Sequence, residues 1–206
     1  IKSLNSNLQL SGKLIKLADY SAIYYLDQNQ IRHLFSNQNV FWSWYDGTWA
    51  DQNIETISQA KFDSYSVGNN ITVRPGTKLI KFQNSGRIYA ISPSKILHYL
   101  DSNVLNQLYP DYQSRLTIMQ NSFEADYIYG DKLDNGIYPD GALIQYVDSQ
   151  VVWYIENGQK REIIDEAFGL NNFKDQDVIK NVKTNLYYGI TTPIKSLSAS
   201  LFPYSI

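Results

Sequence analysis

The sequence predicts an α+β fold made of three tandem repeats. The first observation behind this prediction is a short segment that occurs three times, each time opening with a glycine and an apolar pair: Gly12–Lys16, Gly76–Lys81 and Gly141–Gln145. Its leucine recurs as Leu14, Leu79 and Leu143, so the second step along the chain is only one position shorter than the first. Self-similarity at a fixed period is the signature of a repeat architecture.

Two further segments keep the same spacing and support the repeat. The first is apolar and aromatic: Ile23–Leu26, Ile88–Ile91 and Val152–Ile155. The second contains a polar pair: Ile31–Leu34, Ile96–Tyr99 and Lys160–Ile163. Stretches rich in Gly, Pro and Asn separate the copies. We therefore place the repeats at residues 11–74, 75–138 and 139–195, followed by a C-terminal tail at residues 196–206.

Each repeat is expected to open with a strand followed by a β-hairpin. Leu14–Leu17 and Ala22–Asp27 are rich in branched and aromatic residues, which favour strands. In the third repeat, Asn157–Gly158 separates two apolar runs, and Asn-Gly is a strong signal for a two-residue hairpin turn. The matching segments Asp27–Gln30 and Ser92–Lys95 also have the composition of turns.

Two short helices are expected to follow the hairpin in each repeat. Ser36, Asp101 and Asp165 each precede an apolar pair and can act as N-caps, because a side-chain oxygen accepts a free backbone N–H. The helices are then predicted at Asn37–Trp44, Ser102–Leu108 and Glu166–Leu170. A second helical turn is predicted after Ser58. A lone repeat of about 64 residues is marginally stable, so we expect the three to pack into one compact or slightly curved array.

The overall composition limits the class of protein. The formal net charge is −2, from 18 basic and 20 acidic residues, which gives no general attraction to nucleic acid. The sequence contains no apolar run long enough to span a membrane, so direct membrane insertion is not expected. Cysteine is absent, which excludes disulfides and thiolate metal sites. A surface rich in Tyr, Asn, Gln and Ser favours a secreted or cell-surface protein over the alternative of a cytosolic protein that lacks Cys by chance.

The third repeat carries the clearest motif, in Val152–Ile155 and Asn157–Arg161. Together with the Gly-x-Leu-Ile-Lys start of Gly12–Lys16, this pattern resembles tandem repeats found in exported, cell-wall-associated or surface-associated bacterial proteins. The second repeat departs from it, because it lacks the turn glycine and the arginine. The resemblance implies a location at the cell wall or surface layer, and it implies no activity.

The first repeat contains a cluster of aromatic residues that the other copies do not reproduce. It combines rings with nearby carboxylates: Trp42, Trp44, Tyr45, Trp49, Asp46 and Asp51. A pyranose can stack on such rings while polar groups bind its hydroxyls, so these six residues are the candidate ligand site. The alternative is a hydrophobic core, since Phe41 and Trp44 lie three apart on one helix face.

The two histidines occupy one repeat position, His33 and His98, and the third repeat has Glu162 there. The three would complete a two-His-one-carboxylate metal site if the repeats converged, whereas the alternative is a polar strand position. An acidic loop before the third repeat raises the question of calcium, against ordinary turn chemistry: Asp131, Asp134, Asn135 and Asp140. Neither pattern is specific enough, and we predict no metal and no cofactor.

The sequence contains none of the common catalytic motifs, such as Gly-x-Ser-x-Gly, His-Glu-x-x-His or a phosphate-binding glycine loop. We therefore predict no enzyme activity. The expected function is a non-catalytic repeat module of an exported bacterial surface protein, serving structure, adhesion or cell-wall attachment. A carbohydrate-binding module that uses the tryptophan cluster is the alternative, and a glycoside-processing enzyme is the third. The expected partners are a cell-wall or surface glycan, or another protein.

Overall fold

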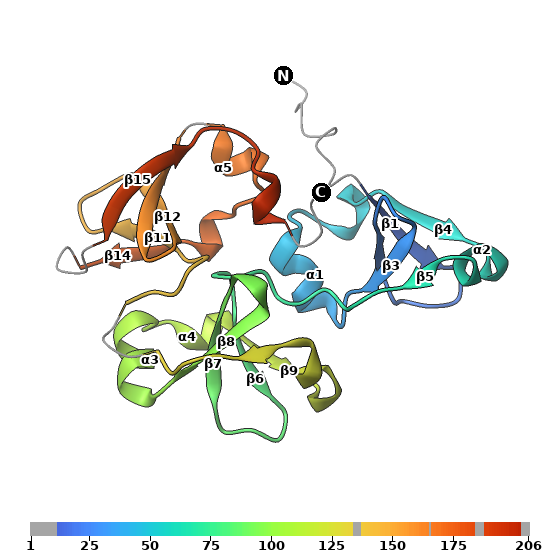
Figure 1. The fold of residues 1–206 in the computed structure, drawn as a ribbon, viewed down its shortest axis with the longest axis horizontal. Coiled ribbons are helices and arrows are strands. Elements are labelled where there is room, and N and C mark those ends of the chain that lie inside the picture. The colour runs from blue at the N-terminus through green and yellow to red at the C-terminus, as the bar shows by residue number, and fades with distance from the viewer. Residues whose placement is uncertain (1–11, 134–136, 165, 184–187, 203–206) are drawn as a thin grey trace. The chain divides into compact units, whose positions relative to one another are not determined.

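The computed structural model describes residues 12–133, 137–164, 166–183 and 188–202. It contains three five-stranded sheets with short helices, and each sheet draws its strands from one repeat (Figure 1). The α+β class and the three repeats that the sequence predicts are therefore present. Within the described residues, every helix is too short or too polar to cross a bilayer.

The first sheet has an antiparallel meander at its centre and a parallel strand on each side. Its order is β4-β1-β2-β3-β5, with β4 parallel to β1 and β5 parallel to β3. The strands are β1 Lys13–Leu17, β2 Tyr24–Leu26, β3 Ile31–Leu34, β4 Ile54–Ile57 and β5 Ser66–Val67.

The other two sheets repeat this topology. The second has the order β10-β8-β7-β6-β9 and the third has the order β14-β11-β12-β13-β15. The second contains β6 Leu79–Phe82, β7 Ile88–Ser92, β8 Ile96–Leu100, β9 Leu116–Met119 and β10 Ile128–Tyr129. The third contains β11 Leu143–Tyr146, β12 Val152–Glu156, β13 Gln159–Ile163, β14 Ile179–Val182 and β15 Gly189–Ile194. One chain topology therefore occurs three times.

The expected unit of a strand, a hairpin and two helices omitted the two outer strands of each sheet. These strands are short, and β5 contains only Ser66 and Val67. They pair in parallel with strands far away in the sequence, so no local alternation or turn signal marks them. Each repeat is thus richer in strands than the sequence indicates.

The helices are short and lie between the strands. The α-helices are α1 Gln38–Trp44, α2 Gln59–Asp63, α3 Ser102–Leu108, α4 Tyr112–Arg115 and α5 Ala167–Leu170. The 3₁₀ turns are η1 Trp49–Asp51, η2 Pro93–Lys95, η3 Asn121–Asp126, η4 Asp175–Asp177 and η5 Ala199–Leu201.

The helix caps show how local sequence sets these boundaries. Asp101 caps α3, because its Oδ1 accepts the backbone N–H groups of Asn103 and Val104 at 2.9 Å. The cap of α1 is Asn37 rather than the predicted Ser36, because Asn37 is extended and its Oδ1 accepts the N–H groups of two residues in the first turn. The third predicted cap, Asp165, lies outside the described residues.

The hairpin of the third repeat has the turn that its sequence predicts. Asn157 and Gly158 both have positive φ angles, 53° and 66°, as a two-residue turn between paired strands requires. The first repeat reaches the same connection differently, with the Asp27 carboxylate accepting the N–H groups of Asn29 and Ile31 at 2.9 and 2.8 Å. Different local chemistry therefore supports one hairpin.

The chain forms two compact units. The first is Ile1–Thr72 together with Ser198–Ile206, and the second is Val73–Leu197. In the first, Ile15, Leu26, Ile57 and Phe62 form a buried cluster. In the C-terminal segment, which the sequence presents as a tail, Leu201 and Phe202 are buried. The described part of the predicted tail thus packs into a folded unit.

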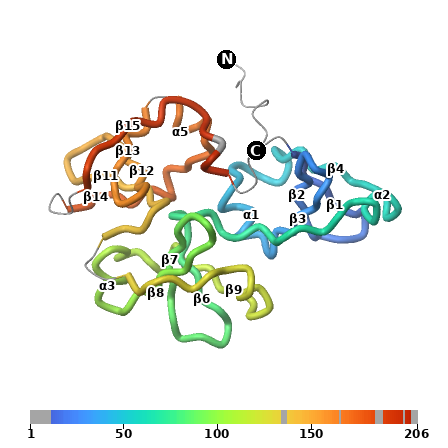
Figure 2. Tube along the Cα trace, in the orientation of Figure 1, coloured from blue at the N-terminus to red at the C-terminus, as the bar shows by residue number. Residues whose placement is uncertain are grey.

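Repeats 2 and 3 make up the second unit, whose backbone runs from green through yellow to red in Figure 2. The two repeats share one hydrophobic core. The buried side chains come from both: Leu79, Ala90, Leu100, Leu105, Leu108 and Tyr109 with Tyr138, Ala142, Ile144, Ile155, Ile179, Val182 and Tyr188. Because neither repeat completes this core alone, we treat the two as one cooperative body.

Equivalent positions of repeats 2 and 3 face one another. A Cβ atom added to Gly76 would lie 2.0 Å from the carbonyl oxygen of Gly141, the glycine that opens the next repeat. Arg115, just before β9, donates to the carbonyl of Asp177, just before the equivalent β14. Contacts between like positions define an approximate two-fold relation. This differs from a solenoid-like row, in which unlike faces meet.

A tyrosine hydroxyl near the end of each of these repeats binds the backbone just before the repeat begins. Tyr127 Oη accepts the N–H of Val73 at 3.2 Å, and Tyr188 Oη accepts the N–H of Tyr138 at 2.6 Å. Both rings are buried, and burial raises the pKa of both hydroxyls. The two neutral hydroxyls thus link the last part of each repeat to the backbone that precedes it.

Replacing Tyr188 with Phe is expected to lower the free energy of unfolding of the second unit by about 1–2 kcal/mol, because the Tyr138 N–H loses its buried acceptor. Urea denaturation of the full chain measures the change. Tyr112→Phe removes a hydroxyl from a half-buried ring on α4 and is the matched control. Equal losses in the two variants would contradict the assigned role of Tyr188.

Candidate functional site

The predicted aromatic cluster forms an exposed ledge on the first unit, which we define as Trp42 and Trp49. Trp42 comes from α1 and is half-buried, whereas Trp49 opens η1 and is 45% exposed. Their ring centroids are 4.4 Å apart. Both rings contact Phe41 at 4.9 Å, and Phe41 is buried in the core. The ledge is therefore supported from beneath by a fixed ring.

Hydrogen bonds hold the loop that carries Trp49. The Asp51 carboxylate accepts both the N–H and the hydroxyl of Thr48, at 2.7 and 2.8 Å. These bonds lower the pKa of Asp51. Gln52 Nε2 donates to the carbonyl of Asp46 at 2.7 Å, and Gly47 supplies the turn with a φ of +88°. The loop is thus ordered by its own polar groups.

Not all of the predicted site residues are available to a ligand. Trp44 is buried, and its Nε1 donates to the carbonyl of Thr72 at 2.8 Å, so its place in the binding platform is corrected to a place in the core. Tyr45 stacks on Phe41 with ring centroids 4.6 Å apart, and burial raises the pKa of its hydroxyl. Tyr45 supports the ledge from behind.

The two predicted carboxylates lie in the exposed loop beside the ledge. Asp46 is exposed, and Asp51 is exposed but bound to Thr48. Asp46 thus offers carboxylate oxygens to solvent, while Asp51 orders the loop. The structure brings together Trp42, Trp49, Asp46 and Asp51 in the segment of the first unit that runs from α1 to η1.

The other repeats show what the fold requires at the Trp42 position. The N-caps of α1 and α3 are Asn37 and Asp101, and an equal count from each cap pairs Trp42 with Asn106. Aligning Ala167 with Val40 places Gly169 there in the third repeat. Asn106 and Gly169 are both exposed. A large aromatic ring at this position is therefore not a demand of the fold, which favours a binding role.

The two histidines tie strands to loops. In the first unit, His33 Nδ1 lies 2.8 Å from the carbonyl oxygen of Asn69, and His33 Nε2 lies 3.5 Å from the Asp27 carboxylate. In the second, His98 Nδ1 lies 2.9 Å from the carbonyl oxygen of Asp131, and Nε2 lies 2.8 Å from the Ser92 hydroxyl. Each ring thus connects its strand to the segment that follows the outer strand.

These hydrogen bonds account for the shared repeat position of His33 and His98. Both ring nitrogens of His98 are within hydrogen-bonding distance of protein atoms. Across the described part of the chain, no three or more His, Asp or Glu side chains gather in a way that could hold a metal ion. Glu162, the third member of the set considered above, is half-buried on β13.

The acidic loop before the third repeat is described only in part. Asp134 and Asn135 lie outside the described residues. The Asp131 carbonyl oxygen lies against the His98 ring, and the Asp140 carboxylate accepts the N–H of Gly158 at 3.1 Å. Asp140 therefore has a structural role in the hairpin of the third repeat.

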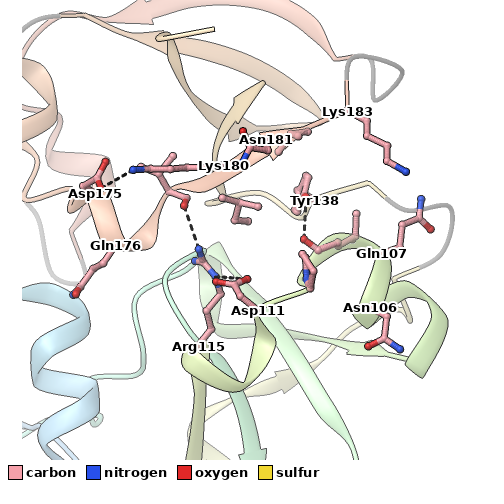
Figure 3. Close-up of a pocket in the computed structure, with 15 residues that line it drawn as sticks. Asn106, Gln107, Asp111, Arg115, Tyr138, Asp175, Gln176, Lys180, Asn181 and Lys183 are labelled. Atoms are coloured by element: carbon pink, nitrogen blue, oxygen red, sulfur yellow. Dashed lines mark hydrogen bonds and ion pairs between the residues drawn. The ribbon is translucent and has the colours of Figure 1, made fainter. Parts of the chain in front are cut away.

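A groove of about 680 Å³ with a mixed polar and apolar lining lies within the second unit, between repeats 2 and 3. Figure 3 shows α3 and its following loop on one side, β14 on the other, and Tyr138 between them. We call this the inter-repeat groove, and its polar lining includes Asn106, Gln107, Tyr138, Lys180, Asn181 and Lys183. Tyr138 Oη donates to the carbonyl of Leu108 at 2.9 Å, which fixes the floor.

Arg115 joins the two walls of the inter-repeat groove. Its Nε lies 3.3 and 3.2 Å from the two carboxylate oxygens of Asp111. Its two terminal nitrogens donate to the carbonyls of Asp177 and Val178, each at 3.1 Å. The Arg115 side chain is buried, so its bonds to the two carbonyls form away from bulk water, whereas the Asp111 side chain is 53% exposed. This single residue links α4 to the start of β14.

Further buried charges lie within the second unit. Arg74 donates to the carbonyls of Asn171 and Asn172 at 2.7 Å, and burial lowers its pKa to about 10. Lys174 Nζ lies 3.5 Å from the Asp177 carboxylate, and burial raises the pKa of Asp177 despite these nearby cations. The polar contacts within the Val73–Leu197 unit are therefore specific and water-poor.

The comparisons with known proteins give no family. No protein-family model matches the chain, and no curated protein matches it. Among solved structures, one similar chain is from a structure described as the periplasmic assembly from the ESX-5 inner membrane complex. It is 13% identical, with 90% of this chain and 67% of that chain covered, at a TM-score of 0.25.

The sequence does not predict the inter-repeat groove or the structural role of Arg115. The groove is formed by residues far apart in the chain, such as Asn106 and Lys180, so no local pattern marks it. The segment Tyr112–Leu116 carries Arg115 where the third repeat carries Asp177. In the structure Arg115 donates to the backbone carbonyl of Asp177, so the Asp177 side chain does not by itself mark this contact in the sequence.

Proposed function

We propose that the chain is a non-catalytic repeat module of an exported bacterial surface protein that attaches to a cell-wall or surface glycan. The observation that carries this proposal is the aromatic ledge. Trp49 is 45% exposed beside Trp42. Trp42 occupies a helix position where the other repeats have exposed Asn106 and Gly169, so the fold needs no aromatic ring there.

The ledge has the chemistry that a glycan requires. Indole rings present large, rigid apolar faces, and the C–H face of a pyranose packs on such a surface. Trp42 and Trp49 meet at 54°, so the pair forms an angled surface rather than one flat plane. The exposed Asp46 carboxylate, which lies between the two tryptophans along the chain, can accept hydrogen bonds from sugar hydroxyls. Stacking and hydroxyl recognition are therefore available together.

The remaining repeats suit a structural role. Repeats 2 and 3 share one core and are joined by the buried Arg115, which makes them one stiff body. A stiff body in the same chain as a glycan-binding unit is the arrangement expected of an attachment module that transmits load to a surface. The resemblance of the third repeat to surface-protein repeats supports the same proposal.

Replacing Trp49 with Ala is expected to weaken binding to cell-wall glycan fragments by about tenfold, because a central aromatic contact contributes more than about 1 kcal/mol. Trp42→Asn installs the residue of the second repeat at the same helix position and is expected to have a similar effect without unfolding α1. Isothermal titration of peptidoglycan fragments measures both. Tyr20→Ala removes an exposed ring of the same unit that lies outside the ledge, and it is the matched control.

Unchanged binding in both tryptophan variants would place the glycan elsewhere on the chain. A wild-type chain that binds no fragment of wall or surface glycan would overturn the proposed function itself.

A further inference from the structure

The inter-repeat groove exposes the edge of a strand. Residues 178–183 line the groove one after another, including all of β14. Successive side chains of a strand point to opposite faces, so a surface lined by consecutive residues is formed by the strand edge. Among the described strands, β14 pairs only with β11, on its other side. The groove therefore has a sheet edge as one wall.

The backbone at this edge already recruits a hydrogen-bond donor. Arg115 donates to the carbonyls of Asp177 and Val178, where β14 begins. A sheet edge presents N–H and C=O groups that favour pairing with another extended chain. Arg115 thus supplies donors for the two carbonyls that precede β14. The stretch from Ile179 to Lys183 continues along the groove and does not bond to Arg115.

The opposite wall suits a peptide. Asn106 and Gln107 are exposed at the C-terminal part of α3, and their amides both donate and accept hydrogen bonds. Figure 3 shows both on the α3 side, with Tyr138 between α3 and β14. The volume of about 680 Å³ is in the range of pockets that hold a drug-sized ligand, which is enough for a short stretch of peptide.

The charges in the groove favour an acidic occupant. Arg115, Lys180 and Lys183 give three positive charges, while Asp111 and Asp175 give two negative charges, so the sum is +1. Arg115 pairs with Asp111 at 3.2 Å, and Lys180 pairs with Asp175 at 2.7 Å. The net positive charge therefore lies at the Lys183 end of the edge.

The same charges disfavour a second copy of this chain as the occupant. Two β14 edges placed together would bring Lys180 and Lys183 against their own equivalents, and like charges across an edge are repulsive. Asn181 has a φ of +58°, and the β11–β14 register shifts between Ile144 and Tyr146. Such an irregular edge pairs with a short segment more readily than with a long regular strand.

We propose that the inter-repeat groove is a binding site for an extended acidic peptide of a partner protein, which adds beside β14 as a further strand. One edge of the peptide backbone forms hydrogen bonds with the β14 edge. Its other edge faces the side-chain amides of Asn106 and Gln107, and an acidic side chain of the peptide pairs with Lys183. The buried ring of Tyr138, 6% exposed, offers no stacking platform, so the groove favours a peptide over a glycan. This proposal does not depend on the aromatic ledge.

The experiment selects random linear peptides displayed on phage against the biotinylated full chain. Peptides that carry Asp or Glu are expected to be enriched, and Lys183→Glu is expected to weaken their binding by about tenfold through charge reversal. Lys195→Glu makes the same change at an exposed lysine outside the groove and is the matched control. Asn106→Ala with Gln107→Ala tests the opposite wall, with Asn103→Ala of the same helix as control. In the chain labelled with fluorotryptophan, the ¹⁹F resonance of Trp153 verifies that each variant is folded.

A second measurement tests strand addition. Replacing backbone amides of an enriched peptide with esters is expected to weaken binding by about fivefold for each hydrogen bond removed. Three results would overturn the proposal: no peptide enriched over the groove variants, an ester series that binds as well as the parent peptide, or a glycan whose binding is lost in the groove variants. Because Trp49→Ala leaves the groove intact, its effect on glycan binding separates failure of this proposal from failure of the proposed function.

Discussion

Replacing Arg115 with Ala is expected to lower the free energy of unfolding of the Val73–Leu197 unit by about 3–5 kcal/mol. The guanidinium is buried and donates to two backbone carbonyls of the next repeat, at 3.1 Å each. Alanine leaves those carbonyls without their donor, and it also leaves a cavity where the side chain packed. Buried groups that lose a charged partner cost more than exposed ones, because water cannot replace the lost bonds.

The measurement is urea denaturation of the full chain labelled with fluorotryptophan. Trp153 is the tryptophan that lies outside the cluster at residues 42–49, so its ¹⁹F resonance reports on repeat 3, whereas the mutation lies in repeat 2. A lower midpoint at Trp153 therefore tests the coupling of the two repeats directly. Arg115→Lys keeps the charge but cannot reach both carbonyls with a planar fork, so it is expected to recover only part of the loss.

Arg87→Ala is the matched control for this experiment. Arg87 is exposed in repeat 2, with its guanidinium 5.3 Å from the ring centroid of Tyr99. Its removal is expected to cost less than about 1 kcal/mol. If Arg115→Ala shifted the Trp153 midpoint no more than Arg87→Ala does, Arg115 would not couple the repeats.

The features that the sequence predicted correctly are those set by local chemistry. The repeat of the central strands follows from apolar runs at constant spacing, and the hairpin of repeat 3 follows from Asn157–Gly158 because both positions accept positive φ. The cap at Asp101 is equally local, since its carboxylate binds the next helical turn. The cap of α1 moved from Ser36 to Asn37, because two adjacent residues could both cap and the backbone decided between them.

The outer strands could not be predicted in the same way. β5 contains only Ser66 and Val67, and α1, β4 and α2 all lie between it and its partner β3 along the chain. Strand formation there depends on tertiary pairing rather than on residue preference. The same limit explains the aromatic cluster, where Phe41 and Trp44 share the predicted buried face but the exposure of Trp49 depends on how η1 folds back.

The contacts between repeats 2 and 3 could not be predicted from the sequence for a further reason. Gly76 and Gly141 are typical of turns, and both do have positive φ angles, 74° and 95°. Nothing in the sequence shows that the two turns also press against each other. When a glycine is needed both for its turn and for a close contact with a distant segment, the neighbouring residues in the sequence indicate only the turn.

Replacing Gly76 with Ala separates these two requirements. The positive φ alone costs about 1–2 kcal/mol for a residue with a Cβ atom. The added Cβ would also lie 2.0 Å from the carbonyl oxygen of Gly141 and 2.7 Å from the Cα of Ala142, and both are backbone atoms that cannot rotate away. The two repeats would have to separate locally, which disturbs the core that they share. We expect a total loss of about 3–5 kcal/mol, again read at Trp153.

Gly158→Ala is the control that isolates the tertiary part. Gly158 has a positive φ of 66°, close to that of Gly76, but a Cβ atom there would meet nothing within 4 Å. Its expected loss is only the backbone cost of about 1–2 kcal/mol. The difference between the two variants measures the free-energy cost of separating like faces of repeats 2 and 3. Equal losses would mean that Gly76 serves its turn alone, and that the approximate two-fold contact contributes nothing to stability.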